Sequence, residues 1–393
     1  TFNAGATLGP VNETNMARIW NKHKQSNTPL KRKVFVAMSG GVDSSVSAAL
    51  LKKAGFDVIG IFMKCWSADD PMGENCTSSD DERMARLAAH KIGIPFYSLN
   101  FIKEYKERVV NYMLEGYRKG ITPNPDVMCN KHIKFGLFFE KAMRLGTDFV
   151  ATGHYARLSR KFPISSSRVP KSRKQQKETV HILAARDENK DQSYFLSMID
   201  PAVLLNVMFP IGEYTKPQVR ELAKKFGLPN AERKDSQGIC FVGKVDFSDF
   251  LKHYIPPKKG EIHDMEGNVL GEHEGAVYYT IGQRKGLGLA GGPYFVVDKD
   301  VKRNIVEVSK DENDLLKSRV KISHINWFAK PKKFPANLHV KLRYRSPMAE
   351  AVLEERAGEK HVLNFMDPQR AVTKGQFAAL YDNNEMIGAG VIS

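Results

Sequence analysis

The sequence predicts an α/β protein in three parts: an N-terminal doubly wound parallel sheet, a small central α/β domain and a C-terminal antiparallel β-barrel. Three observations support this prediction. From Lys33 onward, short apolar runs alternate with helical stretches, which is the pattern of a parallel sheet covered by helices. After Pro210 only a short helical unit follows. From Ala276 the helical periodicity ends, and short strand-like runs are separated by turn residues.

The N-terminal domain is expected at residues 33–210, after a basic arm at 1–32. Its apolar runs predict strands, and its helical periodicity predicts the helices between them. The expected strands are 33–38, 58–63, 95–99 and 148–151. The expected helices are 45–54, 80–92, 103–119 and 135–145. Residues 159–177 hold seven Lys or Arg, five Ser and no acid, so we expect a solvated insertion there, with a surface loop favoured over an RNA contact.

The central domain is expected at residues 211–275 and the barrel at 276–393. In the central domain a helix at 216–226 should end at Gly227, because glycine commonly follows the last turn of a helix. The barrel is predicted from short runs that alternate apolar and polar residues, most clearly at 336–345. The expected strands are 277–281, 294–298, 304–308, 339–345, 350–354, 362–365 and 376–381.

Composition and charge narrow the class of function. No stretch of the 393 residues approaches the roughly 20 apolar residues of a membrane-spanning helix. Lys and Arg number 60 against 44 Asp and Glu, and this net charge of +16 favours a polyanionic partner, with nucleic acid as the first candidate. The four cysteines exclude a disulfide scaffold and indicate a reducing compartment.

The first strand is followed directly by the sequence SGGVDSS at Ser39–Ser45. Gly40 and Gly41 let the backbone approach an anion closely, and the next helix directs its N-terminal amides at that anion. The loop lacks the Gly-Lys-Ser/Thr of a Walker motif, so it suits pyrophosphate held as a leaving group. It resembles the PP-loop of ATP pyrophosphatases, which adenylate a carbonyl oxygen. On this motif alone, GMP synthetase, asparagine synthetase-like amidotransferases, argininosuccinate synthetase and tRNA sulfur transferases stay open.

A second glycine pattern, formed by Gly286, Gly288 and Gly291, matches the GxGxxG fingerprint of dinucleotide-binding domains. That fingerprint requires a strand before it and a helix after it. The residues that follow, 293–297, are strand-like. We therefore expect a hairpin or loop here and no nicotinamide site.

Two of the four cysteines lie in segments with functional character. Cys129 follows two prolines and Asp126 in TPNPDVMCN, which predicts an irregular loop that places the thiol on a rigid scaffold. Cys240 lies in DSQGICF, beside a glycine and polar groups. A reactive thiolate needs a cationic or dipolar neighbour, which the lysines after Cys129 and the Arg-Lys pair before DSQGICF can supply. Cys65 and Cys76 are expected to be buried core residues without a chemical role. Because the sequence has no CxxC pair, a structural zinc site has no support.

With these segments the chain closely resembles the tRNA-specific 2-thiouridylases, both the bacterial enzyme and its mitochondrial counterpart. The resemblance covers almost everything from Lys33 to Ser393, and the basic arm and the insertion depart from it. These departures leave peripheral RNA contacts open. The matching motifs are AMSGGVDSS (37–45), GIFMKCW (60–66), TPNPDVMCNKHIKFG (122–136), ATGHYAR (151–157), KDQSYFL (190–196), RKDSQGICF (233–241), TIGQRKGLG (280–288) and RYRS (343–346).

The resemblance implies an enzyme that uses ATP, with Mg²⁺ accompanying the phosphates, to place sulfur on C2 of the wobble uridine in the tRNAs for Lys, Glu and Gln. It implies no protein metal ligand. The residues implied to hold ATP are Ala37, Met38, Ser39, Gly40, Gly41, Val42, Asp43, Ser44, Met63 and Gly153. Those implied to line the target base are Asn124, Pro125 and Asp126. Those implied to meet tRNA are His154, Lys190, Asp191, Gln192, Arg343, Tyr344 and Gln376.

The chemistry of such a reaction assigns separate roles to the two cysteines. The uracil 2-carbonyl has no leaving group, so its oxygen is adenylated first, and sulfur from a persulfide on Cys240 then attacks C2 while AMP leaves. Cys129 either resolves the persulfide, leaving a Cys129–Cys240 disulfide, or assists as a base. Asp126 is the candidate for proton transfer. The target base has to leave the anticodon stack to enter such a pocket, and phosphate contacts make tRNA binding depend on salt.

Two other functions compete with this interpretation. A PP-loop enzyme that acts on a small nucleotide predicts a glutaminase domain or an ammonia channel, and it leaves the basic surplus unexplained. A tRNA-binding protein with a purely structural nucleotide site predicts that replacing Asp43 or Cys240 leaves function intact. We favour the thiouridylase, supplied with persulfide by a desulfurase or a relay protein. The basic arm, the basic insertion and a first residue other than Met favour a mitochondrial enzyme, with the bacterial cytoplasm as the alternative.

Overall fold

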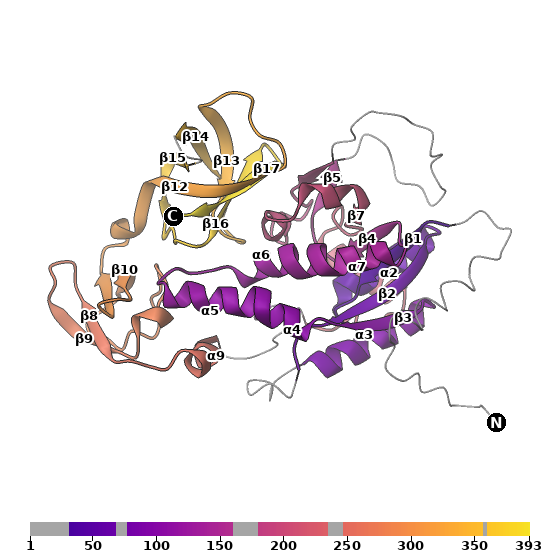
Figure 1. Cartoon of the computed structure of the whole chain (residues 1–393), viewed down its shortest axis with the longest axis horizontal. Coiled ribbons are helices and arrows are strands. Elements are labelled where there is room, and N and C mark those ends of the chain that lie inside the picture. The colour runs from indigo at the N-terminus through magenta and orange to yellow at the C-terminus, as the bar shows by residue number, and fades with distance from the viewer. Residues whose placement is uncertain (1–30, 68–76, 160–179, 235–246, 357–359) are drawn as a thin grey trace.

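The computed structural model of the chain describes residues 31–67, 77–159, 180–234, 247–356 and 360–393 (Figure 1). Several predictions fall outside these ranges. The basic arm, nearly all of the basic insertion, Cys76 and Cys240 are among them. Helices cover both faces of the N-terminal sheet, and Figure 1 shows the barrel above it and the small central sheet at the far end of two long helices.

The N-terminal domain contains the predicted parallel sheet, in the strand order β3-β2-β1-β4-β7. Each strand is a short apolar run, and the helices α2 and α3 follow the first two strands as expected. The strand order reverses between β1 and β4, since β2 and β3 extend the sheet on one side of β1 and β4 lies on the other. The strands are β1 Lys33–Ala37, β2 Asp57–Lys64, β3 Phe96–Asn100, β4 Phe149–Thr152 and β7 Val207–Met208. The two helices are α2 Val42–Lys53 and α3 Ser78–Ile92.

Two long helices with π-helical segments run from this sheet towards the central region (Figure 1). The second helix corrects one prediction, because Cys129 lies on a helix and not in an irregular loop. Pro125 occupies the first helical position, where its fixed φ fits, and the Asn124 side chain caps the helix. The first helix comprises α4 Ile102–Tyr105, η2 Lys106–Val110 and α5 Asn111–Arg118. The second comprises α6 Pro125–Cys129, η3 Asn130–Phe138 and α7 Phe139–Arg144.

The central region contains a four-stranded sheet in the order β10-β11-β8-β9. The predicted boundary after residue 275 falls between β9 and β10, inside this sheet. The strand predicted at 277–281 is wrong: Ala276–Tyr278 forms a 3₁₀ turn, η6, because glycines at 275 and 282 with positive φ turn the chain on both sides. The GxGxxG glycines lie in the turns before β10, with no helix after them, as expected. The elements are α8 Lys216–Lys225, α9 Phe247–Tyr254, β8 Gly260–His263, β9 Val269–His273, β10 Phe295–Asp300 and β11 Ile305–Ser309.

The C-terminal barrel is confirmed, and it closes through six antiparallel strands in the order β12-β15-β14-β13-β16-β17, with β12 also pairing with β17. The sequence patterns missed β12 and β17. The inward-facing side chains form a buried apolar cluster that includes Leu338, Val340 and Leu380. The strands are β12 Leu316–Trp327, β13 Ala336–Lys341, β14 Ala349–Arg356, β15 Lys360–Arg370, β16 Phe377–Asp382 and β17 Glu385–Ile392.

The barrel is joined to the N-terminal domain by main-chain pairing. Strands β5 (Arg157–Ser159) and β6 (His181–Leu183) pair with each other in antiparallel orientation, and β6 pairs with the start of β17. Two short 3₁₀ segments, η4 (Ser193–Leu196) and η5 (Pro201–Asn206), continue the chain between the hairpin and β7. The barrel and the N-terminal domain therefore share an edge of sheet as well as side-chain contacts.

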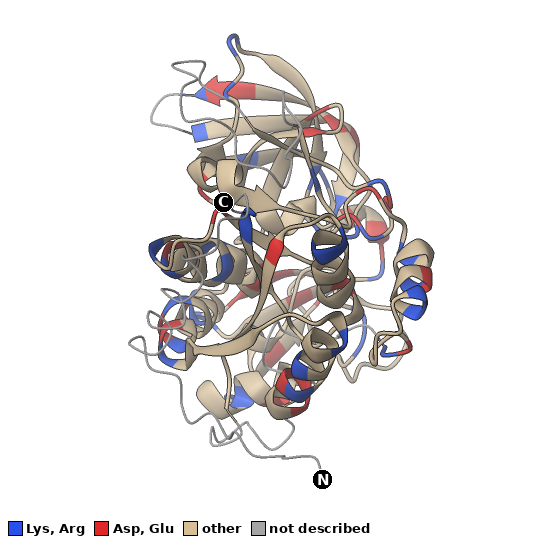
Figure 2. Ribbon diagram, turned by 90° about the vertical axis from the view of Figure 1, so that its right-hand side faces the viewer, with Lys and Arg blue, Asp and Glu red and all other residues tan. Residues whose placement is uncertain are grey.

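A buried ion pair crosses the same junction. Lys341 Nζ on β13 lies 2.9 Å from Asp191 Oδ2, and the two side chains are 7% and 3% exposed. Asp191 also accepts from the main-chain N–H groups of Ala185 and Ser193, and Ser193 Oγ lies 2.9 Å from Tyr381 Oη. Figure 2 shows Lys, Arg, Asp and Glu on many of the described helices and strands. The Lys216–Asp43 pair, by comparison, is 11% and 30% exposed, so the Lys341–Asp191 pair is the more desolvated of the two.

Replacing only one member of this pair should be strongly destabilising. Lys341→Met leaves the Asp191 carboxylate buried without its cation, and we expect the free energy of unfolding to fall by about 3–5 kcal/mol. The double variant Asp191→Asn/Lys341→Met should lose less than Lys341→Met alone, since no charge is then left buried. Denaturant unfolding of the three proteins measures this. Equal losses in the single and double variants would contradict the argument.

Candidate active site

The SGGVDSS loop lies at the carboxyl end of β1 and leads directly into α2. Gly40 has φ +79°, a conformation that side chains other than glycine rarely adopt, and Gly41 is the N-cap residue of α2. Ser44 Oγ donates to Gly41 O at 3.1 Å and accepts from Ser39 N at 3.2 Å. The first amide N–H groups of a helix have no acceptor within the helix, so this geometry presents donors and a positive dipole end to an anion.

Gly153 completes this edge of the sheet from the end of β4. A Cβ atom at Gly153 would lie 2.6 Å from Ser44 N, so only glycine lets the two segments approach this closely. The loops after β1 and β4 therefore meet where the strand order reverses. This is the position at which open α/β sheets bind their ligands.

Asp43, in the first turn of α2, is held by two partners. Lys216 Nζ lies 2.8 Å from Asp43 Oδ1 and 2.9 Å from Oδ2, and the Tyr155 hydroxyl donates to Oδ1 at 2.9 Å. The Lys216 side chain is 11% exposed and that of Asp43 is 30% exposed. Sequence reasoning missed Lys216, which is 173 positions away on α8, and no local motif points to it.

The segment before the Cys240 motif covers the other side of the loop. Asn230 Nδ2 donates to Gly40 O and to Ser45 Oγ, each at 2.9 Å, and Arg233 Nη1 donates to Gly40 O at 3.2 Å. Arg233 also pairs with Asp81 on α3 at 2.5 Å. The sequence suggested Arg233 as a neighbour of the Cys240 thiol, and the structure places it on the PP-loop.

Cys129 has no exposed surface and belongs to the same buried cluster as Ala37 and Met63, which lie at the ends of β1 and β2. The cluster also contains Cys65 and Trp66, so the expectation that Cys65 is buried is confirmed. The Cys129 thiol therefore lies in the same buried core as the strand ends that are predicted to bind the nucleotide.

The predicted base-binding residues form the start of α6. Asn124 Oδ1 accepts from Val127 N at 3.1 Å, Pro125 follows as the first helical residue, and Asp126 is half-buried in the first turn. Asp126 O accepts from Asn130 Nδ2 at 2.9 Å. Three residues predicted from one motif therefore lie on one helical turn, one turn before the Cys129 thiol.

The residues that the resemblance assigns to tRNA binding lie in two parts of the chain, four of them in the N-terminal domain and three on the barrel. Asp191 is buried in the ion pair with Lys341, and His154 is 7% exposed, with Nδ1 2.6 Å from Thr152 Oγ1. Gln192 Oε1 accepts from Tyr155 N at 3.0 Å, so its side chain supports the strand end of the nucleotide-binding edge. Lys190 is half-buried beside it.

Arg343 and Tyr344 lie on the barrel, away from this edge. Arg343 is exposed and donates from Nη2 to the carbonyl oxygens of Arg370 and Ala371, and burial of part of the guanidinium lowers its pKa. The Tyr344 ring packs on Phe195 with a 4.5 Å distance between ring centroids. Gln376, also on the barrel, does contact the site, because its side chain bonds to Asn124.

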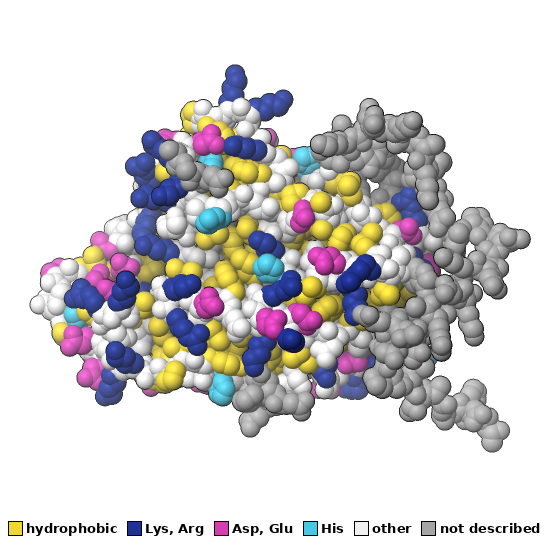
Figure 3. All heavy atoms as spheres, in the orientation of Figure 1, with side chains coloured by type: hydrophobic (Ala, Val, Ile, Leu, Met, Phe, Trp, Pro, Cys, Tyr) yellow, Lys and Arg dark blue, Asp and Glu magenta, His cyan; other side chains and the backbone are white. Residues whose placement is uncertain are grey.

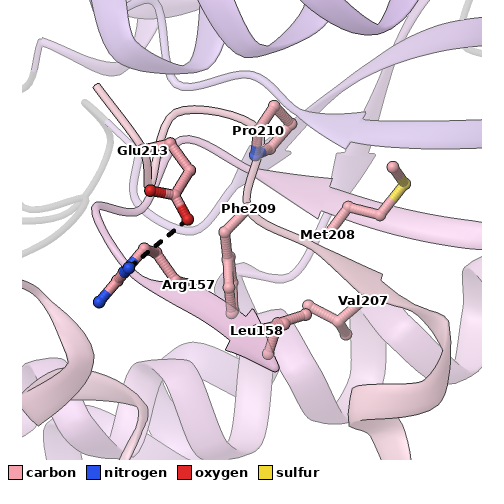
Figure 4. A pocket seen from close by; sticks show the side chains of 7 residues that line it. All are labelled: Arg157, Leu158, Val207, Met208, Phe209, Pro210 and Glu213. Carbon is pink, nitrogen blue, oxygen red and sulfur yellow. Dashed lines mark ion pairs between the residues drawn. The ribbon is translucent and has the colours of Figure 1, made fainter. Parts of the chain in front are cut away.

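A shallow pocket of about 200 Å³ lies between β5, β7 and the loop that follows β7 (Figure 4). Phe209 and Met208 line it, and Arg157 Nη1 faces Glu213 Oε1 across its rim at 3.6 Å. No predicted site residue lines this pocket. It is separate from the edge formed by the PP-loop, Gly153 and Cys129.

A parallel sheet with an anion-binding loop at its point of strand reversal defines a nucleotide-binding α/β protein. Family models agree with this class. Residues 32–244 match a model described as a tRNA methyl transferase HUP domain, residues 248–310 a tRNA methyl transferase PRC-barrel domain, and residues 317–392 an aminomethyltransferase β-barrel domain. Together with the relatives below, these matches show that the chain belongs to the tRNA-specific 2-thiouridylase family.

The relatives are proteins named tRNA-specific 2-thiouridylase MnmA. The protein from Streptococcus mutans is 46% identical over 371 residues, covering 92% of this chain and 95% of its own length. That from Streptococcus sanguinis is 45% identical with the same coverage. A 4-thiouridine synthetase solved with RNA and ATP overlaps 57% of this chain and 50% of its own at 15% identity, with a TM-score of 0.32, which is too low to add to the argument.

The described ranges were also compared with the requirements of a metal site and of a membrane span. They contain no group of three or more His, Cys, Asp or Glu side chains arranged to hold a metal ion. Within the same ranges no helix is both long and apolar enough to cross a membrane.

Lys216→Met should weaken ATP binding by about tenfold, because Asp43 then faces the incoming phosphates without its cation. Equilibrium titration with ATP measures the change. Lys224→Met is the matched control: Lys224 lies on the same helix, is exposed, and pairs with Glu232 at 2.9 Å. Unchanged affinity in Lys216→Met, or an equal loss in Lys224→Met, would refute a role for the Asp43–Lys216 pair.

His154 predicts a pH dependence of stability. Burial, followed by the charge of Lys134, holds its pKa well below 6.5 in the folded protein. As the pH falls below 6.5 the unfolded chain binds a proton that the folded chain does not, so the free energy of unfolding decreases. His154→Asn removes this term. The stability difference between wild type and His154→Asn should therefore shift in favour of the variant between pH 7.5 and 5.5 in denaturant unfolding, and a difference independent of pH would contradict the buried neutral imidazole.

Proposed function

We propose that this protein is an ATP-dependent tRNA 2-thiouridylase that acts on the wobble uridine of the tRNAs for Lys, Glu and Gln. The observation that carries the proposal is the position of Cys129 in one buried cluster with the strand ends that form the PP-loop edge. Membership of the 2-thiouridylase family over 92% of the chain supports the same reaction. The methyl transfer in the names of two family models has no counterpart in this site, whereas a pyrophosphate-binding loop suits adenylation.

The reaction divides into two balanced steps. The uridine O2 attacks the α-phosphorus of ATP, and pyrophosphate leaves towards the amides at the start of α2. The terminal sulfur of a Cys240 persulfide then attacks C2 and displaces AMP. Cys129 either attacks Cys240 Sγ, which leaves a Cys129–Cys240 disulfide and releases 2-thiouridine, or removes a proton as a base. In the second case an external thiol attacks Cys240 Sγ, which releases 2-thiouridine and leaves a mixed disulfide on Cys240.

Mg²⁺ accompanies the ATP phosphates in this proposal. Magnesium prefers oxygen ligands and commonly keeps several waters while bound to substrate phosphates and one or two carboxylates. Both oxygens of the Asp43 carboxylate are already paired with Lys216 Nζ, so in this proposal the phosphates and waters would hold the ion. When bound, the ion would neutralise charge on the departing pyrophosphate, and the amides at the start of α2 and the Ser39 hydroxyl would provide neutral donors to it.

Asp126 is the proposed group for proton transfer to and from the base. It occupies the first turn of α6, between the capping Asn124 and Cys129. A carboxylate there also interacts favourably with the positive end of the helix. Asn124 and Pro125 then define the wall against which the uracil ring stands, as the resemblance implies.

Cys240 lies outside the described residues, and the chain on both sides of it supports its assignment. It is seven residues after Arg233, which bonds to the PP-loop, and seven residues before Phe247. Seven residues span at most about 25 Å. The helix that Phe247 begins packs Phe250 against Trp66 in the cluster that contains Cys129, with 6.0 Å between ring centroids. Both anchors of the Cys240 segment therefore lie beside the proposed reaction centre.

The charge of the chain supports tRNA as the substrate. The net charge is +16, and on the face seen in Figure 3 Lys and Arg side chains gather along the flank of the barrel and beside the central sheet. On β12 the side chains of Lys317, Arg319 and Lys321 are all exposed. Phosphate contacts by such groups release counterions, so tRNA affinity should fall as salt rises. A small-nucleotide substrate leaves this surface without a role.

The compartment and the sulfur donor complete the proposal. The basic arm and the basic insertion favour a mitochondrial enzyme, while the relatives described above are bacterial, which supports the bacterial cytoplasm as the alternative. In either compartment a desulfurase or relay protein has to deliver the persulfide to Cys240. That partner carries its own reactive thiol, because persulfide sulfur passes by thiol exchange.

The test is sulfur transfer to unmodified tRNA for Lys, with Mg-ATP and a persulfide sulfur donor, read by nucleoside mass spectrometry. We expect wild type to form 2-thiouridine with one AMP per thiolated base. Cys240→Ser should lose all product, because it cannot carry the sulfur. Cys129→Ser and Asp126→Asn should each lower the rate by at least about a hundredfold.

Separate readouts identify which part fails. Hydrolysis of ATP to AMP by wild type without 2-thiouridine would keep the adenylation step and refute the substrate. Full activity of Cys240→Ser would refute the persulfide carrier. A disulfide between Cys129 and Cys240 after a single turnover would assign Cys129 to resolution, and product without such a disulfide would assign it to proton transfer.

A further inference from the structure

The side-chain amide of Gln376, in the turn before β16, has both of its ends engaged inside the protein. Nε2 donates to the carbonyl oxygens of Thr122 at 2.9 Å and Pro123 at 3.3 Å. Oε1 accepts from Asn124 Nδ2 at 3.0 Å and from the Tyr194 hydroxyl at 3.3 Å. Both N–H groups and one acceptor site of the amide are therefore engaged. The Tyr194 hydroxyl has one proton, which it shares between Gln376 Oε1 and Phe377 O at 3.2 Å.

The main chain of the same barrel turn supports these contacts. Thr122 N donates to Lys374 O at 2.9 Å. Gly375 has φ +89°, and a Cβ atom there would lie 3.0 Å from Ile121 Cβ and 3.1 Å from Thr122 O. The barrel turn is therefore packed directly on the segment that leads into α6, without room for a side chain between them.

Asn124 transmits this contact to the helix. Its Nδ2 donates to Gln376 while its Oδ1 accepts from Val127 N at 3.1 Å and caps α6. A cap residue fixes where a helix begins and in which direction its first turn points. Cys129 lies five residues after the cap, on the same helix and without exposed surface.

We propose that Gln376 is a positioning residue, through which the C-terminal barrel holds the Asn124 cap and thereby the helix that carries Asp126 and Cys129. Its side chain acts on the site from inside the protein, through Asn124. The inference rests on the proposed function for the meaning of the two positioned residues. The contacts that define it exist in the chain alone, so its first test, the alkylation of Cys129, needs neither tRNA nor ATP.

The test is the rate at which a thiol reagent alkylates Cys129 in the full-length chain, measured by peptide mass spectrometry. Cys65 is an internal reference, because it lies in the same buried cluster and is 1% exposed. Gln376→Ala removes all four side-chain contacts. We expect it to raise the alkylation rate of Cys129 about tenfold, through local opening of α6, and to leave Cys65 unchanged.

Lys374→Ala is the matched control. It removes an exposed positive charge two positions from Gln376 and keeps the carbonyl that accepts from Thr122 N. We expect it to leave the Cys129 rate at the wild-type value. In the thiolation assay, Gln376→Ala should lower kcat with little change in the KM for tRNA, whereas loss of an RNA contact raises KM.

Two results overturn the proposal. In one, Gln376→Ala leaves the Cys129 rate unchanged and weakens tRNA binding, which makes Gln376 a direct RNA contact; in the other, neither quantity changes. If Gln376→Ala also exposes Cys65, Gln376→Glu decides: it keeps an acceptor for Asn124 and Tyr194 and loses only the donors to the two carbonyls. Faster alkylation of Cys129 alone in Gln376→Glu supports the positioning role of Gln376, and an unchanged rate refutes it. Failure of the thiouridylase assay in wild type affects none of these alkylation rates.

Discussion

The close approach of Gly153 to the first turn of α2 is the constraint on which the site depends. Because no side chain separates them, the loops after β1 and β4 share one small volume at the point of strand reversal. The direction of α2, and with it the direction of its amides and dipole, is fixed by that contact. The other groups around the loop, from α3, α8 and the segment before Cys240, are arranged around this fixed helix start.

The electrostatics of the loop follow from the absence of a lysine in its own sequence. Asp43 introduces a negative charge where phosphates would bind, and the compensating Lys216 comes from a distant helix. Arg233 adds a second cation, but it is already paired with Asp81 and bonded to Gly40 O. The two cations are therefore part of the loop's support, and the donors left for phosphate are mainly amides and hydroxyls. These amides and hydroxyls bind a leaving pyrophosphate less strongly than a lysine side chain would.

The sequence predicted the elements that consecutive residues determine, and it missed the features that depend on contacts between distant parts of the chain. The parallel strands were predicted because each is a run of apolar residues, and the PP-loop because its glycines and serines are consecutive. The loop predicted around Cys129 was wrong, since the two prolines were interpreted as breakers although Pro125 is the first residue of a helix. Strand β12 was missed because half of its twelve residues are exposed and polar side chains interrupt its apolar positions, and β17 because glycines interrupt its apolar pattern. Lys216 and Asn230 reach the site only through tertiary contacts, which no motif reports.

The three-part architecture itself argues for a large substrate. The barrel is bound to the N-terminal domain by the β6–β17 pairing, by the buried Asp191–Lys341 pair and by the turn that contacts the start of α6. Adenylation of a small nucleotide requires only the sheet and its loop. A small substrate does not explain why a barrel far along the chain contacts the helix that carries Cys129. A folded RNA that contacts the barrel and inserts one base at α6 does explain it, because both contacts then belong to one rigidly connected surface. The junction between barrel and α6 is thus the structural feature that separates a tRNA-modifying enzyme from a small-molecule adenylating enzyme built on the same sheet.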